Sequence, residues 1–141
     1  LSMSPSLIGV SIAPKRYSHD LIKKTKEFTV NIPTVELAEK VSACGTSSGR
    51  NTDKFKEFGL TAKKGKTIEA PIVEECVAHL ECRLSDAITT GDHTLFIGEV
   101  LSAYIEEELF KNERIDASKF HGLYQIGGTT YTSLSGKIIK S

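Results

Sequence analysis

Two cations, Lys15 and Arg16, stand directly before two hydroxyl-bearing residues, Tyr17 and Ser18. We expect Ser18 to cap a helix, and the N-terminus of a helix presents free backbone N–H groups and a partial positive charge. Cations, a hydroxyl group and free N–H groups together can bind an anion, of which phosphate is a common example. The alternative is a plain capped helix with solvated basic residues, and both interpretations stay open because capping serines are common.

A second polar and basic cluster contains Ser47, Ser48, Gly49, Arg50 and Lys54. A loop of small residues with a glycine lets the backbone approach a ligand closely. The cluster does not match a P-loop, because no Gly-Lys-Ser/Thr follows at the required spacing. Taken by itself, an ordinary surface loop is the favoured interpretation.

The run Gly91-Asp92-His93 has the composition of a hairpin turn. His93 could donate a hydrogen bond or a proton to a ligand near neutral pH. Without other information, a turn histidine with no ligand is the favoured alternative.

Three cysteines, Cys44, Cys76 and Cys82, make an odd count without zinc-site spacing. We interpret all three as structural and expect no disulfide framework, so a reducing cytoplasm is the simplest location. The sequence contains no Gly-x-Gly-x-x-Gly fingerprint, no Gly-x-Ser-x-Gly elbow and no His-Glu-x-x-His helix. We therefore predict neither a Rossmann dinucleotide site nor a metal site.

The 141 residues suit a single domain, with 18 Lys plus Arg balanced by 18 Asp plus Glu. Zero net charge argues against a nucleic-acid partner and against an anionic membrane surface. No apolar run approaches the length of a membrane-spanning helix, and no signal-peptide pattern begins the chain. Because the chain opens on Leu1 and not on an initiator Met, we expect residues 1–141 to form one domain from which an N-terminal segment is missing.

The elements that position these clusters can be predicted from apolar patterning. Residues 7–13 suit a central strand, residues 18–27 a helix capped by Ser18, and residues 28–32 a strand that Pro33 stops. A helix capped by Thr34 is expected to end at Gly45, and a short helix with Phe55 and Phe58 to end at Gly59.

The second half of the chain is predicted to be mainly β. Residues 76–84 alternate as in a half-buried strand, with Glu81 on the outward parity, and residues 94–105 form its partner. Two short strands are expected between Leu123 and Ile139, around Gly127-Gly128. These elements predict an antiparallel, closed or nearly closed barrel with small helices.

Together, ordered segments along nearly the whole chain resemble the flavin reductase-like, FMN-binding split-barrel family, and in particular its flavoredoxin-type branch. Each segment is weak alone, but the ordered set is fairly specific. The matching residues are Ser2-Met3-Ser4-Pro5, Arg16-Tyr17-Ser18, Phe28-Thr29-Val30-Asn31-Ile32, Cys44-Gly45-Thr46-Ser47-Ser48-Gly49-Arg50, Asp53-Lys54-Phe55, Glu75-Cys76, Leu80-Glu81-Cys82, Gly91-Asp92-His93, Gly98-Glu99-Val100, Gly127-Gly128 and Tyr131.

The resemblance implies a mainly β, Greek-key split barrel with short peripheral helices, and a homodimer that binds one FMN per subunit near the subunit interface. It implies that Arg16, Tyr17 and Ser18 help hold the FMN phosphate, that backbone around Ser2 and Met3 faces the ring, and that Lys54 and His93 lie near the flavin as catalytic residues. The full set of cofactor-binding residues that it implies is Ser2, Met3, Ser4, Ser11, Ile12, Ala13, Arg16, Tyr17, Ser18, Ser48, Gly49, Arg50, Lys54 and His93.

Three functions are compatible with these observations. The first is an FMN-dependent oxidoreductase that takes electrons from NAD(P)H. The second is an electron carrier of the flavoredoxin type, whose FMN exchanges electrons with a protein partner. The third is a β-barrel binding module without turnover.

Overall fold

A long two-stranded hairpin forms the centre of the computed structural model, which describes residues 1–134. Strands β6 (Ala78–Thr90) and β7 (His93–Ile105) pair antiparallel along their whole length. The turn between them contains Gly91 at φ +60°, a conformation that glycine adopts without steric cost. The hairpin predicted at Gly91-Asp92-His93 is confirmed.

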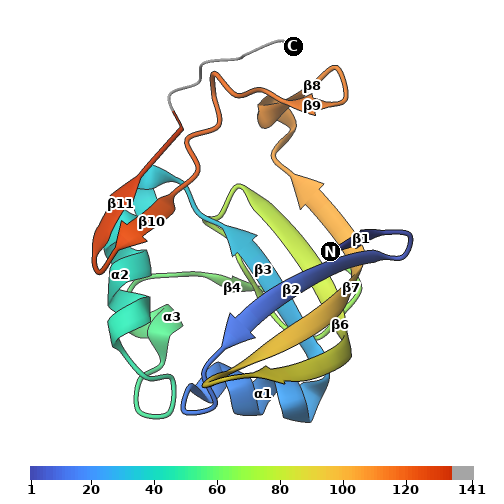
Figure 1. Cartoon of the computed structure of the whole chain (residues 1–141). Coiled ribbons are helices and arrows are strands. Elements are labelled where there is room, and N and C mark those ends of the chain that lie inside the picture. Colours follow the sequence, from blue (N-terminus) through green and yellow to red (C-terminus); the bar gives the residue numbers. More distant parts are fainter. Residues whose placement is uncertain (135–141) are drawn as a thin grey trace.

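Further antiparallel strands extend this hairpin into a five-stranded sheet in the order β1-β2-β7-β6-β3. Strand β2 (Ser6–Ile12) pairs with β7, and β1 (Ser2–Met3) pairs with β2. Strand β3 (Glu27–Ile32) pairs with β6 on the other side. The sheet curls so that β2 and β3 face each other across the barrel (Figure 1).

A small apolar cluster fills the barrel between β2, β3 and the central hairpin. Its buried members are Ile22, Phe28, Cys82 and Phe96, and neither Cys82 nor Phe96 has exposed surface. Partly buried apolar side chains pack around this cluster: Ile8, Val10, Ile12, Val30, Leu80, Leu84 and Val100.

Helix α1 (Tyr17–Thr25) covers one end of the barrel and places Ile22 in the core (Figure 1). The prediction that Ser18 caps this helix is wrong, because the helix begins one residue earlier and Arg16 occupies the N-cap position without a side-chain capping bond. The helix also ends before Glu27, since Lys26 adopts a left-handed conformation and the chain then enters β3.

The predicted helix after Thr34 is divided into a 3₁₀ turn, η1 (Val35–Leu37), and helix α2 (Ala38–Thr46). Thr34 makes no side-chain capping bond, and α2 continues one residue past Gly45. The short helix α3 (Lys54–Glu57) is capped by the carboxylate of Asp53. Its expected stop at Gly59 is confirmed by the positive φ of +59° at that residue.

The remaining elements are short ribbons on the outside of the barrel. Three are two-stranded: β4 (Ala62–Lys63) with β5 (Ile72–Val73), β8 (Phe110–Lys111) with β9 (Arg114–Ile115), and β10 (Tyr124–Gly127) with β11 (Thr130–Thr132). The 3₁₀ turn η2 (Glu107–Leu109) contains most of the acidic run after β7. We expected two strands between Leu123 and Ile139. The part of this range from residue 135 onward lies outside the described residues.

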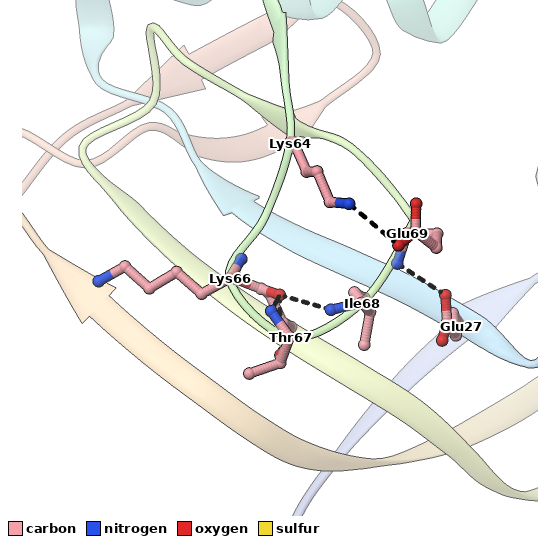
Figure 2. Close-up of polar contacts among 7 residues, drawn as sticks. Glu27, Lys64, Lys66, Thr67, Ile68 and Glu69 are labelled. Atoms are coloured by element: carbon pink, nitrogen blue, oxygen red, sulfur yellow. Dashed lines mark hydrogen bonds and ion pairs between the residues drawn. The ribbon is translucent and has the colours of Figure 1, made fainter.

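The outward position predicted for Glu81 is wrong, because this residue is fully buried. The register of β6 shifts between Glu81 and Cys82, and the loop between β4 and β5 folds over the Glu81 carboxylate. Figure 2 shows Lys66, Thr67 and Ile68, which follow one another in this loop. Their backbone amides donate hydrogen bonds of 2.7, 2.7 and 3.1 Å to the Glu81 carboxylate, and the Thr67 hydroxyl group donates one of 2.8 Å.

The three cysteines are free thiols. Burial raises the pKa of Cys76 and of Cys82 to about 11, with a further contribution from the neighbouring carboxylates of Glu75 and Glu81. Burial also raises the pKa of Cys44. These thiols stay protonated near neutral pH, which agrees with a structural role.

Candidate functional site

The N-terminus of α1 combines several features that suit an anion. The chain leaves β2, makes a turn closed by a 2.9 Å hydrogen bond from the Arg16 amide to the Ala13 carbonyl, and enters the helix at Tyr17. Because no side chain caps the helix, its positive end is available to an external anion. Lys15 and Arg16 add two full positive charges at the same place.

A loop from the second polar cluster lies against this helix end. A Cβ atom at Gly49 would lie 3.1 Å from Cδ1 of Tyr17, so the backbone approaches the aromatic ring closely and only a glycine avoids crowding. Lys54 follows in α3 and donates a hydrogen bond from Nζ to the carbonyl oxygen of Cys44. The two clusters, about thirty residues apart in sequence, therefore form one site.

A cavity of about 880 Å³ lies between these two segments. It is rich in cations, hydroxyl groups and backbone amides, which are the groups that bind a phosphate ester. The lining residues are Ile12, Lys15, Arg16, Tyr17, Ser18, Leu21, Cys44, Gly45, Ser47, Ser48, Gly49, Thr52, Asp53, Lys54 and Phe55.

A second cavity of about 590 Å³ continues from the first along the end of β2. The two cavities share Ile12, Lys15 and Arg16. The second one is also lined by the hairpin turn, where Nδ1 of His93 lies 2.7 Å from Oδ1 of Asp92. The side-chain hydrogen bond with His93 lowers the pKa of Asp92, so this carboxylate stays ionised beside the histidine.

The structure distributes the predicted site residues other than Arg50 over three places. Arg16, Tyr17, Ser18, Ser48, Gly49 and Lys54 line the first cavity, and Ser11, Ile12, Ala13 and His93 line the second, with Ile12 and Arg16 in both. Ser2, Met3 and Ser4 are not brought to either cavity, because β1 pairs with Ser6 and Leu7 at the opposite end of β2.

Arg50 takes a position that the sequence did not predict. Its guanidinium group forms an ion pair with the carboxylate of Asp20 and lies over the ring of Tyr17, with Cζ 5.0 Å from the ring centroid. Asp20 lies in the first turn of α1. Nothing local in the sequence indicates this contact, because the two residues are 30 positions apart.

A third cavity, of about 820 Å³, lies between α1, β2 and β3 and has a different character. Its wall is mostly apolar, and its charged lining groups are the carboxylates of Glu27 and Glu69. Figure 2 shows these two residues side by side, joined by a 3.0 Å hydrogen bond from the Glu69 amide to the Glu27 carboxylate. This cavity is unsuited to an anion.

The described residues contain no group of three or more His, Cys, Asp or Glu side chains that could hold a metal ion. Within residues 1–134, no helix has both the length and the apolar character needed to cross a membrane.

A family model described as "Flavin reductase like domain" matches residues 1–127. The chain is 39% identical over 137 residues to an uncharacterized protein of Archaeoglobus fulgidus, an alignment that covers 97% of this chain and 77% of that protein. It is also 27% identical over 134 residues to the ferric-chelate reductase (NAD(P)H) of the same organism, covering 94% of this chain and 76% of that enzyme.

Two solved structures are similar to this chain over its whole length. An FMN-binding protein from Thermus thermophilus, with bound p-hydroxybenzaldehyde, has a TM-score of 0.89 at 32% identity and covers 100% of this chain and 76% of that chain. The flavoredoxin of Desulfovibrio vulgaris (Miyazaki F) has a TM-score of 0.90 at 27% identity, with the same coverage. The expected mainly β split barrel with short peripheral helices is confirmed.

Proposed function

The chain belongs to the flavin reductase-like domain family, and from this premise we propose that it is an FMN-binding oxidoreductase that takes electrons from NAD(P)H. The observation that carries the proposal is the cavity between the uncapped N-terminus of α1 and the loop at Ser48 and Gly49. Its cations and amides suit the phosphate of FMN. The solved FMN-binding protein and the NAD(P)H-dependent reductase among the relatives support the same choice of cofactor and donor.

The residues of the first cavity fit a phosphate ester. Arg16 and Lys15 supply charge, and the hydroxyl groups of Tyr17, Ser18 and Ser48 can donate hydrogen bonds. Gly49 has no side chain, which lets the loop that carries Ser48 approach Tyr17 closely. We therefore assign phosphate binding to Arg16, Tyr17, Ser18, Ser48 and Gly49.

The second cavity continues toward the hairpin turn and is the place for the flavin ring, with Ser11, Ile12 and Ala13 along one wall. The bound flavin would supply the redox chemistry, accepting a hydride equivalent and passing electrons on. His93 is oriented by Asp92 and can donate a hydrogen bond or proton to the ring. Lys54, held through the Cys44 carbonyl, adds a positive charge to the first cavity, which adjoins the proposed ring site, and this charge favours an anionic reduced ring.

The proposal includes a homodimer in the cytoplasm, as expected from the family resemblance. The three free thiols suit a reducing compartment. Light scattering coupled to gel filtration distinguishes a dimer, which we expect, from a monomer, which would contradict this part.

The test is a visible absorption spectrum of the purified protein, as isolated and after incubation with FMN and removal of unbound FMN by gel filtration, followed by anaerobic addition of NADH or NADPH. We expect flavin bands that NADH or NADPH bleaches. The absence of flavin bands even with added FMN would refute the proposal.

A second candidate is an electron carrier, which the structural similarity to a flavoredoxin supports. The same experiment separates the two functions. Flavin bands that persist with NADH and NADPH but bleach with a reduced redox protein would favour the carrier.

A further inference from the structure

The ion pair between Asp20 and Arg50 connects two segments that form opposite walls of the larger cation-rich cavity. Asp20 lies in the first turn of α1, and Arg50 lies in the loop that follows α2. The Arg50 guanidinium donates a hydrogen bond from Nη2 to Oδ2 of Asp20, and its face covers the Tyr17 ring. Two residues of α1 therefore hold one arginine of the loop.

The helix that presents Asp20 is itself anchored to the barrel. His19 is buried, its Nε2 lies 3.0 Å from the hydroxyl oxygen of Thr94 on β7, and its ring meets the edge of Phe96 at a centroid distance of 5.1 Å. Ile22, one turn later, belongs to the core cluster. Asp20 is therefore held on a helix that is packed against the barrel. Its ion pair with Arg50 attaches the loop to that helix.

The backbone hydrogen bonds of the loop that carries Arg50 join residues within the loop itself. The amides of Asn51 and Thr52 donate to the Ser48 carbonyl at 3.2 and 3.1 Å, and the Arg50 amide donates to the Ser48 hydroxyl at 3.3 Å. These bonds give the loop its shape but do not attach it to α1. Attachment comes from the Arg50 side chain, together with the close contact of Gly49 on Tyr17.

We propose that Asp20 is a positioning residue that acts through Arg50 to hold Ser48 and Gly49 against the N-terminal end of α1, in the geometry that binds the phosphate of the flavin. This role rests on the proposed function. It deepens that function because Asp20 carries the wrong charge to contact a phosphate and works only through its partner.

The direction in which the FMN affinity changes on replacing Asp20 distinguishes a positioning role from a purely electrostatic effect of its charge. Replacing Asp20 by Asn removes a negative charge near the phosphate, which by itself strengthens the binding of an anion. Loss of positioning weakens it. Riboflavin has no phosphate, so its affinity reports whether the rest of the site is intact.

The experiment measures two quantities in wild type, Asp20→Asn and the double variant Asp20→Arg/Arg50→Asp. The first is amide hydrogen exchange of residues 47–51 without flavin, and the second is the dissociation constant for FMN and for riboflavin. The matched control is Glu74→Gln, which makes the same change of charge in an exposed ion pair with Lys63 at 2.8 Å. Both pairs are about half exposed, so their solvent screening is comparable.

We expect Asp20→Asn to speed exchange at residues 47–51 and to weaken FMN binding about three- to fivefold, the scale of one exposed ion pair, with riboflavin affinity unchanged. The charge-swapped variant should recover part of the FMN affinity, and Glu74→Gln should change neither quantity. Unchanged exchange, or FMN binding that is equal or tighter in Asp20→Asn, would overturn the positioning role. If wild type binds no flavin, the proposed function fails, and the exchange data alone decide whether Asp20 holds the loop.

Discussion

The carboxylate of Glu81 on β6 accepts a 3.0 Å hydrogen bond from the hydroxyl group of Tyr104 on β7. Together with the donors of the loop at Lys66, Thr67 and Ile68, this bond surrounds a fully buried negative charge with hydrogen-bond donors. Burial alone raises the pKa of Glu81, but the bonds from these amides outweigh it and lower the pKa to about 2. Glu81 is therefore ionised and fastens the loop between β4 and β5 to the barrel.

Replacing Glu81 by Gln should destabilise the protein by about 3 kcal/mol, because the amide group presents hydrogen atoms to donors that need an acceptor. Urea unfolding measures the loss. Glu74→Gln, which removes an exposed carboxylate, is the control and should cost less than about 1 kcal/mol. Equal stability of the two variants would contradict the role assigned to Glu81.

The free energy of unfolding of the wild-type protein should fall as the pH is lowered, over a pH range set by the folded-state and ordinary pKa values of Glu81. The folded-state pKa of about 2 lies below the ordinary value of 4.5, so the unfolded chain binds the proton first as the pH falls. The contribution of Glu81 is complete above the ordinary pKa and is lost as the pH falls from 4.5 toward about 2. Unfolding free energies measured from about pH 6 to about pH 3 should show a steeper decline for wild type than for Glu81→Gln. Parallel curves would count against this assignment.

Tyr104→Phe should cost about 1 kcal/mol, because it removes one of several donors to Glu81 and keeps the aromatic packing. Burial and the hydrogen bond to Glu81 raise the pKa of Tyr104 to about 12. Ultraviolet titration of the tyrosines of the folded protein should therefore show a component ionising at about pH 12 that is missing in Tyr104→Phe. An unchanged titration would show that the component belongs to another tyrosine.

Gly98→Ala should destabilise the barrel by about 1 to 3 kcal/mol through overpacking. A Cβ atom at Gly98 would lie 2.5 Å from Cζ of Phe28 and 3.0 Å from Cβ of Cys82, and both neighbours are buried. Gly45→Ala is the matched control, since no atom lies within 4 Å of a Cβ there and the position is helical. Thermal unfolding should separate the two variants, and a fully stable Gly98→Ala protein would show that Phe28 can move aside.

Arg16→Gln should weaken FMN binding about tenfold and leave riboflavin binding nearly unchanged, because a charge-assisted contact to phosphate is lost. Isothermal titration with both ligands measures the difference. FMN binding by wild type should weaken with added salt, as expected for exposed charges. An equal loss for both ligands would place Arg16 at the ring and not at the phosphate.

The sequence alone determined the strands and turns whose signals are local. The strand over residues 7–13, the strand that Pro33 stops and the hairpin at Gly91 all agree with the structure to within a residue or so at the strand ends. Glycine and proline act through their own backbone, and apolar patterning acts within a few neighbours, so these elements do not depend on the rest of the chain. The anion site predicted at the basic loop before α1 also rested on local signals, and the structure places this loop at an uncapped helix N-terminus.

Tertiary structure decided which distant groups meet. Glu81 had the parity of a solvent-facing residue, and it became buried because a loop from residues 64–69 folds over it. Arg50 pairs with Asp20, and the loop at Gly49 completes the cavity at Tyr17, only because the loop that follows α2 reaches the N-terminal end of α1. Such contacts join residues tens of positions apart, and their free energy depends on the whole packing arrangement, which no local pattern in the sequence encodes.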